Sequence, residues 1–199
     1  MNGKKIYGLT GMSGAGKTTV CEEFSRSGFD IINCDMIARE VVEKDTPCLD
    51  EIKQKFGGEV ITADGELDRK AMGNIVFNDK AKLLLLNNTI YPYITYEVIQ
   101  RIERSDSGYV LLDAPTLFES GIDYICDGVV SVICDREVSL KRIMARDGID
   151  RKAAESRLKS QHGAEFYKSR SNFCIENNRD FNTLTQTAQK VIQQIKGEI

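Results

Sequence analysis

Short apolar runs alternate with amphipathic stretches along most of the chain. We interpret the continuous apolar runs as strands covered on both faces, which is typical of a parallel sheet. The runs are Lys4–Leu9, Phe29–Cys34, Tyr109–Leu112, Val129–Cys134 and the shorter Cys174-Ile175.

Between these runs, apolar residues recur at the three- and four-residue spacing of an amphipathic helix. The predicted helices are Lys17–Ser27, Met36–Lys44, Pro47–Phe56, Lys80–Ser105, Ser139–Lys159 and Leu184–Ile195. Pro92 is expected to kink or break the fourth, because an inner helical position needs the amide hydrogen that proline lacks. The alternation predicts an α/β fold with a parallel sheet flanked by helices. No repeat or linker divides the chain into independent domains.

Composition places the chain among ordinary globular proteins. Its 199 residues are 41% apolar and 29% charged, enough for one substantial core. A net charge of −3 argues against nucleic acid or an anionic membrane as a partner. No apolar run reaches the roughly 18 residues that span a bilayer, and no signal-peptide pattern is present. We therefore expect a cytoplasmic protein.

Cysteine and histidine give no metal-binding pattern. The six cysteines are never two or three residues apart, and His162 is the only histidine. A zinc site or a redox pair is therefore not predicted. Chemistry is expected to rest on carboxylates, cations, backbone amides and a hard metal ion.

A phosphate-binding loop is the strongest motif. Residues 11–18 match GxxxxGK[ST], directly after a predicted strand and at the start of a predicted helix. The glycines let backbone amides turn towards phosphate, and the helix N-terminus adds its partial positive charge. Lys17 is expected to contact the β- and γ-phosphates, and Thr18 to coordinate Mg²⁺. The predicted nucleotide-binding residues are Gly11, Ser13, Gly14, Ala15, Gly16, Lys17, Thr18 and Thr19.

Three classes of protein carry this loop: regulatory GTPases, motor-type ATPases and small-molecule kinases. The chain has neither the Asn-Lys-x-Asp guanine motif nor an Asp-x-x-Gly switch. The strand that ends at Asp113 is followed by Ala114, where a motor ATPase usually has glutamate. These absences favour transfer to an alcohol over hydrolysis.

Two aspartates follow predicted strands at the edge where open α/β folds bind ligands. Asp35 follows the second strand and could accept the proton of an acceptor hydroxyl. It could also cap the helix predicted from Met36. Asp113 follows the third strand and could reach Mg²⁺ through water.

The segment from Lys141 to Arg170 carries a local excess of positive charge. It contains nine lysines and arginines but only four aspartates and glutamates. Arg142 and Arg146 are four residues apart, so they share a helical face and could clamp a γ-phosphate. A solvated charged face is the alternative. We favour a phosphate-covering lid.

Together these segments resemble the dephospho-coenzyme A kinase family from Gly8 to about Asn177. The resemblance rests on the loop LTGMSGAGKTTV, the run Cys34 to Val42, the segments Phe56-Gly57 and Asp64 to Arg69, Val76-Phe77, Asp113 to Glu119, Arg142 to Gly148, Arg157 to Gln161, and Ile175 to Asn177. The Asp-x-Ile-Ala-Arg run and Pro-x-Leu-Phe-Glu are the specific parts.

The resemblance implies transfer of the ATP γ-phosphate to the ribose 3′-hydroxyl of dephospho-CoA, with Mg²⁺. It implies one kinase domain with a core (about 1–35, 106–138 and 172–199), substrate-binding helices (about 36–105) and a lid (about 139–171). Asp35 would be the base, Arg39 would contact substrate, and Phe118 and Glu119 would border the acceptor. Lys17, Arg142 and Arg146 would be the catalytic cations.

The chain departs from the family pattern in three places. Asn33-Cys34-Asp35 replaces Asp-x-Asp, Ser171-Asn172 replaces Ala-Asp, and Tyr91-Pro92 replaces His-Pro. Any proton or phosphate contact that the usual histidine makes would be lost or replaced by the phenol of Tyr91. A related nucleoside or nucleotide kinase and a nucleotide-binding module without turnover remain the alternatives. We expect a monomer or a small homo-oligomer.

Overall fold

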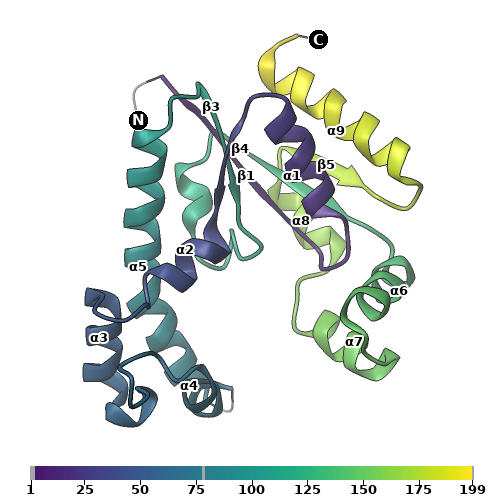
Figure 1. The fold of residues 1–199 in the computed structure, drawn as a ribbon. Helices are drawn as coiled ribbons and strands as arrows, with labels where there is room; N and C mark the ends of the chain where they lie inside the picture. Colours follow the sequence, from purple (N-terminus) through teal and green to yellow (C-terminus); the bar gives the residue numbers. More distant parts are fainter. Residues whose placement is uncertain (1–2, 78, 199) are drawn as a thin grey trace. The chain divides into compact units, whose positions relative to one another are not determined.

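The computed structural model describes residues 3–77 and 79–198 and contains the predicted parallel sheet (Figure 1). Five strands lie in the order β2-β3-β1-β4-β5. β1 pairs in parallel with β3 and β4, and β4 pairs in parallel with β5. The strands are β1 (Lys5–Gly11), β2 (Asp30–Asn33), β3 (Tyr109–Asp113), β4 (Gly128–Ile133) and β5 (Phe173–Glu176).

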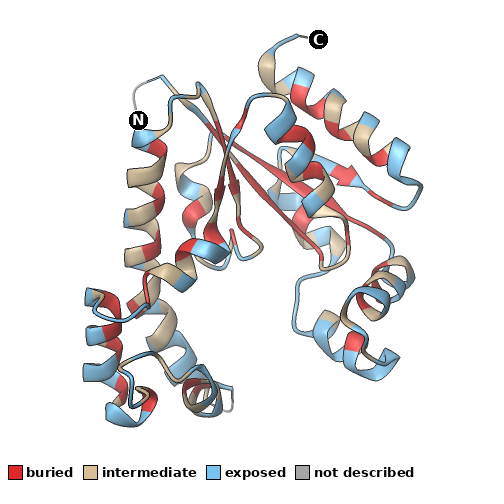
Figure 2. Cartoon of the chain, viewed as in Figure 1, coloured by how far each residue is buried: buried red, intermediate tan, exposed pale blue. Residues whose placement is uncertain are grey.

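The chain divides into two compact units, and the sheet belongs mainly to the first, residues 1–32 and 105–199. Every residue of β4 is buried, so the sheet is covered on both faces (Figure 2). Helices α1 (Lys17–Arg26) and α9 (Phe181–Lys196) pack on each other, and α8 (Ala164–Arg170) contacts β4. The short 3₁₀ helix η2 (Ile122–Ile125) precedes β4.

The second unit, residues 33–104, is helical. The long helix α5 (Lys80–Arg104) contacts α2 (Cys34–Glu40), α3 (Pro47–Phe56) and α4 (Arg69–Val76), and the 3₁₀ helix η1 (Gly58–Val60) follows α3. Pro92 lies inside α5, which continues on both sides of it. An ion pair between Arg101 and Glu40 joins α5 to α2.

The predicted helix Ser139–Lys159 is wrong as a single element. The structure has α6 (Arg136–Asp147) and α7 (Arg151–Lys159), because Gly148 adopts a left-handed conformation (φ 64°) that ends α6. Asp150 then caps α7 by accepting from the Ala153 amide at 2.7 Å. The helix predicted over Met36–Lys44 ends earlier, at Glu40, and α4 and α8 were not predicted.

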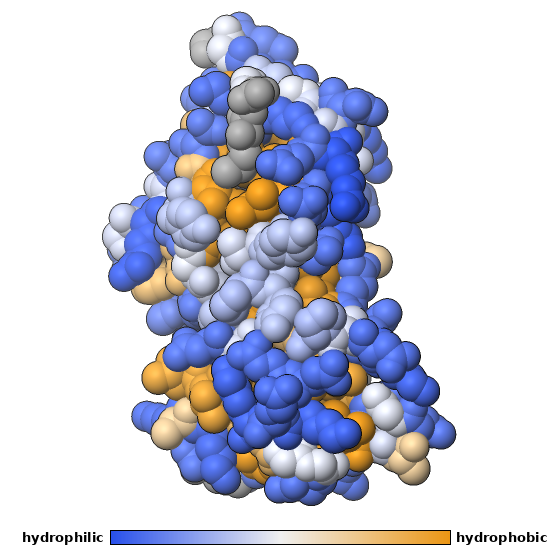
Figure 3. Space-filling view, turned by 90° about the vertical axis from the view of Figure 1, so that its left-hand side faces the viewer, coloured by the Kyte–Doolittle hydropathy of each residue, from blue (hydrophilic) through white to orange (hydrophobic). Residues whose placement is uncertain are grey.

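Helices α6 and α7 pack on each other through a small apolar cluster of their own. Leu140, Ile143 and Ala154 are buried there. Within the described ranges, no helix has the length and apolar character needed to cross a membrane. Figure 3 shows that apolar side chains form separate patches among polar ones on the face it presents.

Candidate active site

The loop that joins β1 to α1 can be built only with glycine at its key positions. Gly11 has a φ of 135°, and a Cβ there would lie 2.0 Å from the carbonyl oxygen of Val132. Gly14 and Gly16 also have positive φ, at 71° and 99°. The backbone therefore bends tightly from the end of β1 into the first turn of α1, as a phosphate-binding loop requires.

Lys17 extends its ammonium group over this loop. Its Nζ donates to the carbonyl oxygens of Gly11 at 2.9 Å and Met12 at 3.1 Å. The positive charge is thus held beside the loop amides and the N-terminus of α1, where an anion is favoured. The contact of Lys17 with the β- and γ-phosphates stays a prediction.

Three consecutive loop carbonyls are held from outside the loop. Ser139 Oγ donates to Ser13 O at 2.6 Å, Arg142 to Gly14 O at 3.3 Å, and Asn177 Nδ2 to Ala15 O at 2.7 Å. In a trans peptide the C=O and the following N–H point in opposite directions. Holding these carbonyls therefore fixes the direction of the amides of residues 14–16, of which the Ala15 amide donates to the Met12 carbonyl oxygen at 3.2 Å.

Asn177 is buried and forms hydrogen bonds with both the phosphate loop and Arg142. Only 5% of it is exposed, and its backbone and side-chain oxygens accept from Arg142 at 3.1 Å and 3.3 Å. Gln161 adds a contact, because its Oε1 accepts from the Ser13 amide at 3.1 Å. Sequence reasoning assigned no role to Ser139, Gln161 or Asn177, although the last two belong to segments that carry the family resemblance.

Arg142 and Arg146 have different partners despite their shared spacing. Arg142 donates to the loop and Asn177, whereas the exposed Arg146 makes two hydrogen bonds to Asp147, at 2.7 and 3.0 Å. Arg157 also pairs with Asp147. Hydrogen bonding from Arg146 lowers the pKa of the Asp147 carboxyl, and the second arginine adds to this. The structure therefore does not bring the two predicted lid cations to one partner.

The two residues predicted to hold Mg²⁺ are Thr18, in the first turn of α1, and Asp113, the last residue of β3. Thr18 is exposed, one turn before Cys21. Burial raises the pKa of the Cys21 thiol to about 11, and the Asp113 carboxylate adds to the shift. A hydroxyl and a carboxylate suit a hard cation that takes its remaining ligands from phosphates and water. Within residues 3–77 and 79–198, no cluster of three or more His, Cys, Asp or Glu side chains forms a metal site.

Phe118 and Glu119 lie against the end of the predicted lid. Phe118 packs edge-on against Phe166, with ring centroids 5.6 Å apart. His162 stacks on Phe166 at 3.5 Å, and its Nε2 lies 3.5 Å from Glu119 Oε1. These two predicted acceptor residues are thus joined to the loop that carries Gln161.

The other predicted acceptor residues lie in the helical unit. Asn33, and not Asp35, caps α2, since its side chain accepts from the Met36 amide at 2.9 Å. Asp35 is therefore exposed in the first turn, and no described residue forms a hydrogen bond or ion pair with it. Arg39 is exposed one turn further on, and Tyr91 is half-buried on α5.

The fold and the loop together define a P-loop kinase fold. A shikimate kinase from Bacteroides thetaiotaomicron, 14% identical, shares it with a TM-score of 0.52 over 96% of this chain and 98% of that chain. A family model described as dephospho-CoA kinase matches residues 5–183. The chain belongs to the dephospho-CoA kinase family, which confirms the resemblance seen in its motifs.

Individual relatives agree with this family over nearly their whole length. Dephospho-CoA kinase of Enterococcus faecalis is 34% identical over 98% of each chain, and that of Fusobacterium nucleatum is 37% identical over 96% of this chain and 98% of its own. Among solved structures, dephospho-CoA kinase from Campylobacter jejuni has a TM-score of 0.71 at 31% identity, covering 98% of this chain and all of that one.

Proposed function

We propose that this chain transfers the γ-phosphoryl group of ATP to the ribose 3′-hydroxyl of dephospho-CoA, giving coenzyme A and ADP. The observation that carries the proposal is the braced phosphate loop with Lys17 across it, in a chain of the dephospho-CoA kinase family. A cytoplasmic location and a monomeric or small homo-oligomeric state remain predictions from the sequence.

The donor half of the reaction belongs to the loop. Its directed amides and Lys17 bind and orient the triphosphate, because fixed donors stabilise phosphate charge without reorganising during the reaction. Thr18 and Asp113 would hold Mg²⁺, which supplies charge neutralisation between the β- and γ-phosphates when bound. Arg142 supports this half through the Gly14 carbonyl and Asn177.

The acceptor half belongs to Asp35 and the residues predicted beside it. An exposed carboxylate that is used neither for capping nor for an ion pair is available to accept the 3′-hydroxyl proton. Arg39 would contact the substrate from the same helix, and Tyr91, Phe118 and Glu119 would complete the acceptor site. Arg146, exposed on α6, would cover the transferring group.

A coupled assay of ADP release tests the proposal. Dephospho-CoA should stimulate ADP formation well above the rate with ATP and Mg²⁺ alone, and adenosine, AMP and shikimate should not. Stimulation by a nucleoside instead would identify a related kinase. Folded, ATP-binding protein with no acceptor-dependent release would identify a binding module without turnover.

A further inference from the structure

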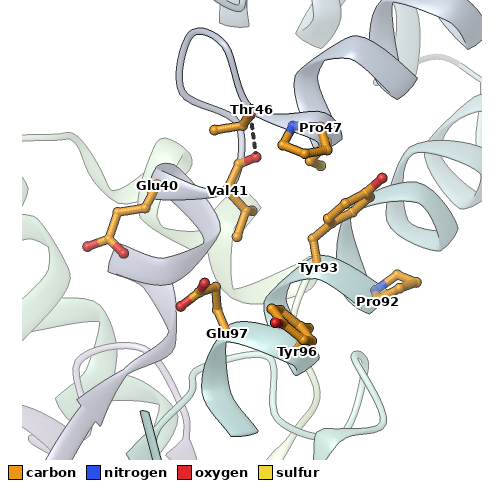
Figure 4. A pocket seen from close by; sticks show the side chains of 9 residues that line it. Glu40, Val41, Thr46, Pro47, Pro92, Tyr93, Tyr96 and Glu97 are labelled. Carbon is orange, nitrogen blue, oxygen red and sulfur yellow. Dashed lines mark hydrogen bonds between the residues drawn. The ribbon is translucent and has the colours of Figure 1, made fainter. Parts of the chain in front are cut away.

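A second concave site lies wholly within the helical unit. The pocket, about 680 Å³ in volume, is formed by the end of α2, the turn into α3 and the part of α5 around Pro92 (Figure 4). That volume is in the range of pockets that bind small organic molecules. Its lining residues are Glu40, Val41, Thr46, Pro47, Cys48, Pro92, Tyr93, Tyr96 and Glu97.

Most of the pocket wall is apolar or aromatic. Cys48 is completely buried and burial raises the pKa of its thiol to about 11, so it acts as a neutral apolar group. The Tyr93 hydroxyl is directed away from the pocket in Figure 4 and donates to Glu51 at 2.8 Å, which leaves the face of its ring as wall. Tyr96 as a whole residue is 62% exposed. These surfaces favour a ligand with an apolar or aromatic body.

One side of the pocket is acidic. Figure 4 shows Glu40 and Glu97 on this side, opposite Pro47 and Tyr93. Arg101 neutralises Glu40. Glu97 is half-buried, and among residues 3–77 and 79–198 it has no hydrogen-bond or ion-pair partner. A half-buried carboxylate beside two aromatic rings favours an ammonium group and disfavours phosphate or carboxylate ligands.

The pocket residues differ from Asp35 and Tyr91 in their position around helices α2 and α5. Each residue of an α-helix is turned by about 100° from the one before it. Glu40 and Val41 therefore lie about 140° and 240° around the axis of α2 from Asp35. On α5, the pocket residues lie between about 100° and 240° around the helix from Tyr91. On both helices the pocket residues therefore lie at least about 100° around the axis from Asp35 and Tyr91.

We propose that this pocket is a second ligand site, separate from the acceptor site, that binds a small amine with an aromatic body. The apolar wall takes the ring, Tyr93 and Tyr96 contact it, and Glu97 pairs with the ammonium group. Only its separation from the acceptor face rests on the proposed function, because the pocket itself is defined by residues of the helical unit alone.

Three small molecules test this site on the full chain: 2-phenylethylamine, 2-phenylethanol and phenylacetate. All three carry a phenyl ring on a short chain, and they differ in whether the polar group is an ammonium, a hydroxyl or a carboxylate. Backbone amide shifts in NMR locate the site, and the titrations give affinities. We expect the amine to perturb amides within residues 40–48 and 93–97 and to bind roughly fivefold or more tightly than the alcohol. Phenylacetate should be the weakest. Perturbations elsewhere only, or preference for the anion, would overturn the proposal.

Variants assign the preference to Glu97. Glu97→Gln should bring the amine and the alcohol within about twofold of each other. Glu103→Gln, an exposed position on the same helix outside the pocket, should keep the preference. Tyr96→Ala should weaken the amine severalfold. A preference that survives Glu97→Gln would contradict the site. Binding is measured without turnover, so a failure of the kinase assay leaves this result independent.

Discussion

At the scale of single residues, the geometry of the phosphate loop depends most directly on Gly11 and Asn177. Gly11 provides a backbone conformation and a close approach to β4 that a side chain would block. Asn177 is a buried amide that uses both its donor and its acceptor to join the loop to Arg142. The motif predicted the first residue, whereas the second lies 162 residues from its loop partner Ala15.

Replacing Gly11 with alanine should disrupt the loop. The added Cβ would meet the Val132 carbonyl in a positive-φ conformation, so we expect a loss of about 1–3 kcal/mol or more in unfolding free energy. Chemical denaturation measures it. Gly108→Ala is the matched control, since a Cβ there meets nothing within 4 Å. Equal stability of the two variants would show that Gly11 does not approach β4 this closely.

Replacing Asn177 with alanine should weaken ATP binding as well as stability. The Ala15 carbonyl would lose its donor and Arg142 one acceptor, at a cost of about 1–3 kcal/mol. Because the loop amides lose their orientation, calorimetry should show a raised dissociation constant for ATP. Asn178→Ala is the control, since Asn178 pairs with Asp135 and does not contact the loop. If the Asn177→Ala variant bound ATP as tightly as the wild type, the claim that Asn177 orients the phosphate loop for ATP would be wrong.

At the scale of elements, helices α6 and α7 of the predicted lid are held together by charge as well as by their small apolar cluster. Asp147, the last residue of α6, pairs with Arg146 on the same helix and with Arg157 on α7. Three lid side chains, Ser139, Arg142 and Gln161, contact the phosphate loop. The predicted lid segment is therefore joined to the loop that would hold the donor.

The Asp147 pair should make stability depend on pH. In the folded protein the pKa of the Asp147 carboxyl is lowered from its ordinary value of 3.8. The stability that this carboxylate contributes is therefore fully present above the pKa of the unfolded chain. It is lost as the pH falls through the lower pKa of the folded protein. Asp147→Asn should therefore melt at a lower temperature than the wild type near pH 6. The difference should disappear in strong acid. Thermal melts from about pH 6 down to about pH 2 measure it, and a difference independent of pH would exclude the ionic cause.

The elements also show how far the sequence predicts this molecule. Apolar runs predicted the parallel strands because burial on both faces leaves a clear pattern, and the glycine motif predicted the loop. Gly148 carried the signal for the end of α6, but the charged sequence on either side masked it. Ser139 and Asn177 could not be assigned from spacing, because contacts between distant segments decide where they lie. The spacing of Arg142 also did not predict its partners, which are backbone carbonyls and the Asn177 side chain.

At the scale of the whole molecule, the proposed reaction needs both units. The donor loop is in the unit with the sheet, and Asp35 and Arg39 are in the helical unit. The two halves should therefore fail separately when mutated.

Asp35→Asn should lower turnover by about a hundredfold or more, as loss of a general base does, while ATP affinity stays within about twofold of the wild type. Lys17→Ala should lower turnover by on the order of a hundredfold and also weaken ATP binding. Calorimetry with ATP and the acceptor-dependent ADP assay measure the two effects. Full turnover in Asp35→Asn would refute its role as the base.

Identification of the product tests the central claim most directly. The protein is incubated with ATP, Mg²⁺ and dephospho-CoA, and the products are followed by phosphorus NMR against authentic coenzyme A. We predict one new 3′-phosphomonoester for each ADP formed. Release of inorganic phosphate without a new ester, or an ester at another hydroxyl, would contradict the account.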